Sequence, residues 1–213
     1  MARIDDFKES FRLASLELNR KDPVMLARTA GVELSSRADG RELIVNYLGG
    51  NYLVEISSKT DIRRQDSAEE VPLPDKILIA HYLLGASGKR PHGKLITFRQ
   101  VPDGQFYFDA FQKRARDPFV SFFGANGRLF RKCAETMGAK PVENGDFGME
   151  FRVFPQICVQ LVLWQGDDEF PPESSVLFED NIQYDLEVED VAVLSGMLVY
   201  RLMGIARSLQ AGG

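Results

Sequence analysis

The chain has 213 residues, of which 44% are hydrophobic and 27% charged, and its formal net charge at pH 7 is −5. This composition is that of a folded globular protein and argues against extensive disorder. The acidic balance disfavours binding to nucleic acid and to anionic membranes, because both need a positive field.

The cysteine content indicates the redox compartment and limits the cofactors that the chain can hold. Cys133 and Cys158 are the only cysteines, and both lie in apolar patterns typical of small buried side chains. Two buried thiols fit a reducing compartment better than a disulfide framework. They are too few to hold an iron–sulfur cluster, or, with two histidines, a structural zinc ion. We therefore predict a cytoplasmic protein that carries no cofactor and no metal.

The sequence predicts one domain over residues 1–213, within the range of a single α/β-type domain. The first six residues lack a basic region followed by an apolar run, so we expect no secretory signal. The apolar stretch at residues 191–200 is shorter than the roughly 20 residues that cross a bilayer, so we expect no membrane span.

The N-terminal third predicts two helices and a β-hairpin. Asp22 and Pro23 favour the start of a short second helix, and Gly31 favours its end. The first helix is predicted from apolar residues at spacings of four, three and four: Phe7, Phe11, Ala14 and Leu18.

Residues 42–57 predict a hairpin with Gly49 and Gly50 as its two-residue turn. One face of this hairpin is wholly apolar and should lie on the core. The turn fixes the expected cross-strand pairs, which are Tyr47 with Tyr52, Val45 with Val54, and Leu43 with Ile56.

The middle of the chain alternates loops and short elements. Residues 59–71 are charged and predict a solvated loop, and Pro72 and Pro74 favour a helix that ends near Gly85. Residues 94–100 predict a strand. Residues 109–138 predict two or three short helices, with starts expected at Asp109, Asp117 and Asn126 and ends at Gly124 and Gly138.

A second hairpin and a long helix close the chain. Residues 149–154 and 157–164 predict its strands, and the second is apolar on both faces, which is typical of a central strand. A short strand near residues 175–178 follows. The last helix, from residue 188 to 206, is apolar nearly all round and should be buried, with Gly196 as a close-packing notch. We therefore predict an α+β fold of antiparallel hairpins packed against helices, with a buried C-terminal helix.

The most distinctive candidate site is an acidic loop flanked by aromatic residues. Its carboxylates could bind a hard cation such as Mg²⁺ or Ca²⁺, but three adjacent acids cannot all point one way, and no calcium-loop spacing is present. An ordered structural or partner-binding loop is the favoured interpretation. The residues expected to contact a partner are Trp164, Asp167, Asp168, Glu169 and Phe170.

Charge is unevenly distributed along the chain. Residues 111–132 contain six bases and one acid, interleaved with Phe119, Phe122 and Phe123, which suggests a nucleic-acid or phosphate patch. Aromatic residues at helical spacing are more often core, so we favour solvated faces of amphipathic helices. Nucleic acid is the least favoured partner.

The two histidines differ in setting. His81 lies on an apolar helical stripe and is favoured as a core residue. His92 lies in a glycine-rich loop with Arg90, and this pair is a candidate anion-binding site. The sequence contains no nucleophile motif and no Walker-type loop, so the two histidines define no catalytic centre. An acid–base pair of carboxylates stays open, because such a pair needs no sequence motif.

From the acidic loop onward the sequence resembles a known family. The resemblance is carried by Trp164, the run Gly-Asp-Asp-Glu-Phe-Pro-Pro at 166–172, the run Val-Leu-Phe at 176–178, Glu189-Asp190 and the Gly196 helix. It is clearest over residues 160–205. The family is the uncharacterised domain-of-unknown-function family 3786 of anaerobic bacteria and archaea, and it implies no catalytic residues.

Some relatives carry an added cysteine-rich, iron–sulfur-type segment that this chain lacks, so a redox role is not implied for it. The resemblance implies a prokaryotic accessory protein of anaerobic metabolism, near corrinoid or iron–sulfur proteins. We expect a non-catalytic binding or accessory protein with a protein partner. The alternative is a divalent-metal-dependent hydrolase or transferase that uses residues 167–169. The sequence does not define the oligomeric state.

Overall fold

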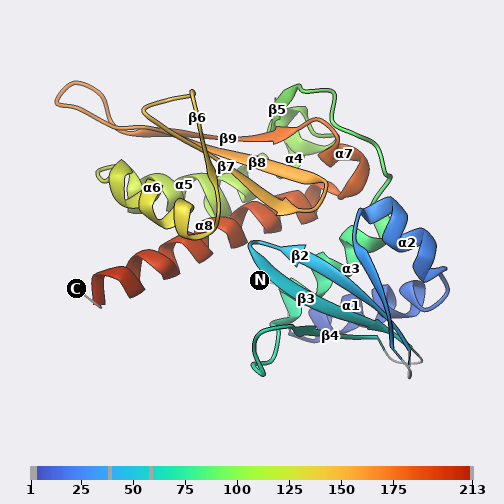
Figure 1. Ribbon diagram of the computed structural model, residues 1–213. Helices are drawn as coiled ribbons and strands as arrows, with labels where there is room; N and C mark the ends of the chain where they lie inside the picture. Colours follow the sequence, from blue (N-terminus) through green and yellow to red (C-terminus); the bar gives the residue numbers. More distant parts are fainter. Residues whose placement is uncertain (1–3, 38–39, 58–59, 212–213) are drawn as a thin grey trace. The chain divides into compact units, whose positions relative to one another are not determined.

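The computed structural model describes residues 4–37, 40–57 and 60–211 (Figure 1). The chain divides into two compact units. The first comprises Met1–Arg90, Phe154–Gln156 and Tyr184–Leu186, and the second comprises Pro91–Val153, Ile157–Gln183 and Glu187–Gly213. The prediction of a single domain over residues 1–213 stays a prediction. Across the described ranges, no helix combines the length and the apolar character needed to span a bilayer.

Among its described residues, the first unit contains three helices and an antiparallel sheet in which neighbouring strands follow one another in sequence. The helices are α1 (Ile4–Leu18), α2 (Pro23–Ala30) and α3 (Leu73–Gly85). The strands are β1 (Glu33–Arg37), β2 (Gly40–Tyr47), β3 (Gly50–Ile56) and β4 (Asp61–Arg64).

The predicted start and end of α2 are confirmed. The Asp22 side chain accepts a hydrogen bond from the Val24 backbone N–H, and Pro23 occupies the first helical position. Gly31 ends the helix at φ 64°, a left-handed conformation that glycine adopts without penalty.

The predicted register of the first hairpin is wrong by two residues. Leu43 pairs with Val54, and Val45 pairs with Tyr52, because the turn consists of Leu48 and Gly49. Both turn residues have positive φ, 47° and 79°, as primed two-residue turns require. A shift of two residues keeps every side chain on its predicted face.

The predicted loop at 59–71 was wrong in part, because it contains β4, which pairs with β3 at the edge of the sheet. Ile62 is the one apolar residue of this strand, and it is 1% exposed. A single apolar position among charged neighbours gives no alternating pattern, so the sequence did not indicate a strand.

A stack of three buried aromatic rings lies in the core of the first unit. Phe154 stacks on Tyr82 at a centroid distance of 4.2 Å and on Tyr47 at 4.9 Å. The Tyr82 hydroxyl donates a 2.6 Å hydrogen bond to the Ala30 carbonyl, so its polar end is satisfied inside the core.

The second unit contains a five-stranded antiparallel sheet in the order β5-β9-β8-β7-β6, with helices packed on it. Its strands are β5 (Leu95–Thr97), β6 (Lys140–Val142), β7 (Phe147–Phe154), β8 (Ile157–Trp164) and β9 (Glu173–Glu179). Its helical segments are η1 (Phe98–Gln100), α4 (Gly104–Phe111), η2 (Gln112–Arg116), α5 (Asp117–Phe123), α6 (Gly127–Thr136) and α8 (Val188–Ala211). A short helix, α7 (Ile182–Asp185), precedes α8.

The predicted position of β8 is confirmed, because it is the middle strand of this sheet and its residues 157–163 are all buried. The α+β class, the antiparallel hairpins and the buried C-terminal helix are confirmed as well. Helix α8 packs against α4, η2, α5 and α6, and Leu194, Leu198 and Leu202 are all 0% exposed.

One helix start was predicted wrongly. Asp109 lies inside α4, and the helical path continues from α4 through the π-helical turn η2 into α5. The prediction that Gly196 of α8 permits close packing is confirmed. A side-chain carbon at this position would lie 3.1 Å from the carbonyl oxygen of Arg114 in η2. π-Helical turns are rare and often occur at functional sites.

Candidate functional site

The acidic loop at residues 165–172 joins β8 to β9 and projects beyond the end of the sheet (Figure 1). The Asp167 carboxylate organises it by accepting hydrogen bonds from the backbone N–H groups of Glu169 (2.9 Å) and Phe170 (2.8 Å). The Asp167 N–H donates in return to the Phe170 carbonyl at 2.9 Å. These bonds close a tight Asx-type turn, so the backbone of the acidic loop is held in one shape.

The base of the acidic loop is fixed to its surroundings. The Gln165 N–H donates to the Asp146 carboxylate at 2.8 Å, and the Gln165 amide donates to the Ala125 carbonyl at 3.3 Å. Pro172 packs on Gly124 so closely that a side-chain carbon at position 124 would lie 2.7 Å from the proline ring. The predicted stop at Gly124 therefore also makes room for the end of the acidic loop.

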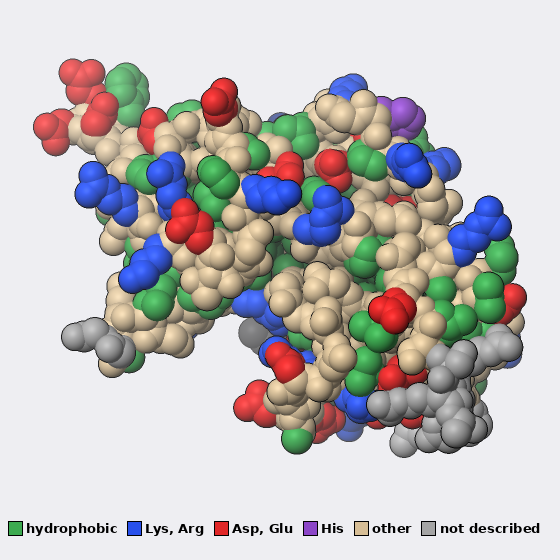
Figure 2. Space-filling model, viewed as in Figure 1, with side chains coloured by type: hydrophobic (Ala, Val, Ile, Leu, Met, Phe, Trp, Pro, Cys, Tyr) green, Lys and Arg blue, Asp and Glu red, His purple; other side chains and the backbone are tan. Residues whose placement is uncertain are grey.

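The aromatic residues on either side of the acids face solvent. Phe170 is 67% exposed and Trp164 is 39% exposed. Asp168 and Glu169 are also exposed, and Figure 2 shows acidic side chains gathered beside a hydrophobic one at this loop. Large apolar side chains on a rigid, charged loop are typical of contact surfaces between proteins.

Hydrogen bonds from the Phe170 and Glu169 backbone lower the pKa of Asp167 below its ordinary value. Because the folded pKa is depressed, the turn gains stability above the unfolded pKa and loses it as the pH falls through the folded pKa. We expect carbon-detected NMR titration to place the Asp167 midpoint below the reference of about 3.9. The Glu169 and Phe170 amides should move with it, and D167N should remove that movement.

The grouping of possible metal ligands bears on the alternative function. Within residues 4–37, 40–57 and 60–211, no three His, Cys, Asp or Glu side chains are grouped so that they could hold a metal ion. Asp167 uses its carboxylate on the backbone of its own loop. The geometry therefore lends no support to the metal-dependent hydrolase or transferase.

The aromatic residues of the basic segment serve mainly as core. Phe119 and Phe123 are 0% exposed, and both lie against the ring of Phe130. Two of the segment's cations have partners beside them: Arg116 lies 3.6 Å from Asp117, and Arg131 lies 5.1 Å from the Phe147 ring. These positions favour amphipathic helices over a nucleic-acid platform.

The candidate anion-binding residues lie in different units. Arg90 is exposed and belongs to the first unit, whereas His92 belongs to the second. His92 Nδ1 lies 2.9 Å from an Asp180 carboxylate oxygen, and its backbone N–H donates to the other oxygen at 2.9 Å. Because His92 has a carboxylate partner, anion binding at these residues gains no support from its contacts and stays a prediction.

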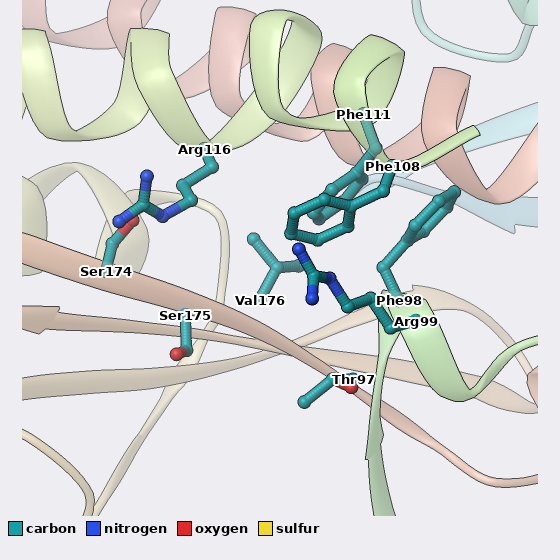
Figure 3. A pocket seen from close by; sticks show the side chains of 9 residues that line it. All are labelled: Thr97, Phe98, Arg99, Phe108, Phe111, Arg116, Ser174, Ser175 and Val176. Atoms are coloured by element: carbon teal, nitrogen blue, oxygen red, sulfur yellow. The ribbon is translucent and has the colours of Figure 1, made fainter. Parts of the chain in front are cut away.

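A cavity that the sequence did not indicate lies in the second unit, with a volume of about 180 Å³ (Figure 3). It opens between β9 and the helical path from α4 to η2. Its apolar lining is Phe98, Phe108, Phe111 and Val176, and its polar lining is Thr97, Arg99, Arg116, Ser174 and Ser175. These residues come from separate parts of the chain and share no motif, so only the fold brings them together.

The fold and these surfaces define a two-unit α+β protein with an exposed acidic loop and a small cavity in its second unit. The family model of a domain of unknown function, DUF3786, matches residues 22–201. The chain therefore belongs to the DUF3786 family, which confirms the resemblance that is clearest over residues 160–205. No curated protein and no solved structure matches the chain.

Proposed function

We propose that this protein is a non-catalytic binding module that attaches to another protein through the acidic loop. The contact surface consists of Trp164, Asp167, Asp168, Glu169 and Phe170. The observation that carries the proposal is that Phe170 is 67% exposed at a position that two backbone hydrogen bonds to Asp167 hold in place. A loop whose backbone is already held by hydrogen bonds in the free protein loses less entropy on binding.

The charges of the acidic loop select the partner. Asp168 and Glu169 are exposed beside Phe170, so a matching surface has an apolar pocket rimmed by lysine or arginine. Such a partner belongs, in this proposal, to the corrinoid or iron–sulfur proteins of anaerobic prokaryotes, in line with the family resemblance. The accessory protein contributes binding and no chemistry of its own.

The thiols support a reducing compartment and a non-catalytic role. Cys133 and Cys158 are both free and buried. Burial raises the pKa of the Cys158 thiol to about 12, so it stays protonated and is a poor nucleophile at neutral pH. A cytoplasmic location is part of the proposal on this ground.

Affinity purification from native lysate with the full chain as bait tests the contact surface. We expect F170S, and separately the triple change D167N, D168N and E169Q, to weaken capture of the main partner by roughly 30-fold, the loss typical of a hot-spot residue. Raising the salt concentration should weaken the wild-type complex, because exposed charges are screened.

The matched control is F106S, since Phe106 is 87% exposed on α4 and lies outside the acidic loop. It should retrieve the same proteins as the wild type. If the loop variants also retrieve them in equal amount, the acidic loop is not the contact surface and the proposal fails.

A further inference from the structure

Ser174 is the feature of the cavity that points to a ligand. It is 6% exposed, and within the described ranges its hydroxyl has no hydrogen-bond partner. Buried hydroxyls in folded proteins are nearly always paired, because an unpaired one loses its hydration without compensation. In Figure 3 the Ser174 side chain points from β9 toward the guanidinium of Arg116.

The polar lining of the cavity carries positive charge and hydrogen-bond donors, which suit an anion. It contains two guanidinium groups, Arg99 and Arg116, together with hydroxyl groups, and no carboxylate. The Arg116 side chain is 35% exposed, and its Nη1 lies 3.6 Å from Asp117, a long ion pair that leaves other guanidinium donors available to a ligand. Arginine matches a carboxylate with two parallel hydrogen bonds.

The apolar lining contains a pair of stacked aromatic rings. Phe98 and Phe111 are 1% and 3% exposed, and their rings stack at 4.2 Å with an interplanar angle of 5°. Arg99 lies 3.9 Å from the Phe108 ring centroid and so extends this wall. Val176, which follows Ser174 on the same face of β9, is 5% exposed and contributes an aliphatic surface.

The volume of the cavity matches a ligand with about one ring. The cavity measures about 180 Å³, and an engineered protein cavity of about 150 Å³ is known to hold benzene. A ring between the aromatic wall and Val176 would leave room for one small charged group.

We propose that this cavity binds a small monocyclic carboxylate. The ring lies against Phe98, Phe108 and Val176, and the carboxylate accepts hydrogen bonds from the Arg116 guanidinium. The carboxylate also accepts a hydrogen bond from the Ser174 hydroxyl, which thereby gains the partner that it lacks in the free protein. This site is independent of the acidic loop, so its test does not depend on the proposed function.

NMR titration of the full chain with benzoate tests the site. We expect saturable shifts of the Ser174, Ser175 and Arg116 amides at benzoate concentrations on the order of millimolar. Benzamide, which is neutral, and inorganic phosphate, which lacks a ring, should each bind at least about tenfold more weakly.

Two variants and one control locate the binding groups. R116Q should weaken benzoate binding about tenfold or more, and S174A about threefold to tenfold. S174A should keep or raise the Tm of the free protein, because it removes an unpaired buried hydroxyl. R128Q, an exposed arginine outside the cavity, should bind like the wild type.

Any one of three outcomes overturns the proposal. If benzoate produces no saturable shifts at these amides, or if benzamide or phosphate binds as well as benzoate, the cavity is not a carboxylate site. The same holds if R116Q and R128Q bind benzoate equally well.

Discussion

Replacing Phe154 by alanine should lower the free energy of unfolding by about 3–5 kcal/mol, the range for removing a buried phenylalanine ring. Phe154 is 0% exposed and stacks on both Tyr47 and Tyr82, so the substitution opens a cavity and removes two aromatic contacts. For a chain of this length we expect the Tm to fall by roughly 6–20 °C. Urea unfolding followed by far-ultraviolet circular dichroism measures the change.

F106A is the matched control for that experiment, because the Phe106 side chain is 87% exposed. It should change the free energy of unfolding by no more than about 0.5 kcal/mol. An F154A protein as stable as F106A would show that the stack of Phe154 between two tyrosines does not form the centre of the first unit.

The first hairpin shows how far periodicity determines a structure. Alternation placed Leu43, Val45 and Tyr47 on the buried face, and all three are 0% exposed. It could not choose between two turns one residue apart, whose strand pairings differ by two residues, since both bury the same side chains. Turn geometry made that choice by placing Leu48 at φ 47°, a conformation that leucine seldom adopts and that the residue type therefore did not predict.

In the second unit, residue type predicted one helix start correctly and another wrongly. Caps gave a correct start at Asn126, whose side chain accepts a hydrogen bond from the Leu129 N–H. Asp109 is an equally good cap by residue type, yet it lies inside α4. The turn η2 packs against α8, where Gly196 allows the Arg114 carbonyl to approach, and such a contact between distant segments has no local signal.

The two candidate sites differ in whether the sequence could identify them. The acidic loop is contiguous, so the sequence identified its residues, and the hydrogen bonds of Asp167 added the reason for its shape. The cavity could not be found from the sequence. Ser174 is a small polar residue in a strand, and only the structure shows that its side chain is buried. Arg116 was noted only as one charge in a basic segment, and its place beside β9 follows from the packing of η2 on the sheet.

Replacing Phe130 by alanine should also cost about 3–5 kcal/mol, and in the other unit. Phe130 is 0% exposed and lies 4.8 Å from Phe119, 5.8 Å from Phe123 and 6.5 Å from Phe151, measured between ring centroids. The matched control is F170A, because that ring is 67% exposed in the same unit and its loss should be nearly neutral. Urea unfolding measures both variants.

This pair of core substitutions also tests whether the chain is the single domain that its sequence predicts. Trp164 is the only tryptophan and lies in the second unit, so its fluorescence follows that unit, whereas circular dichroism follows helices and strands of both. In a two-state domain all probes report one transition. F154A should then move the Trp164 transition as far as the dichroism transition, and F130A should do the same. If F154A instead leaves the fluorescence transition in place and splits the dichroism curve, the units unfold independently and the chain is two domains.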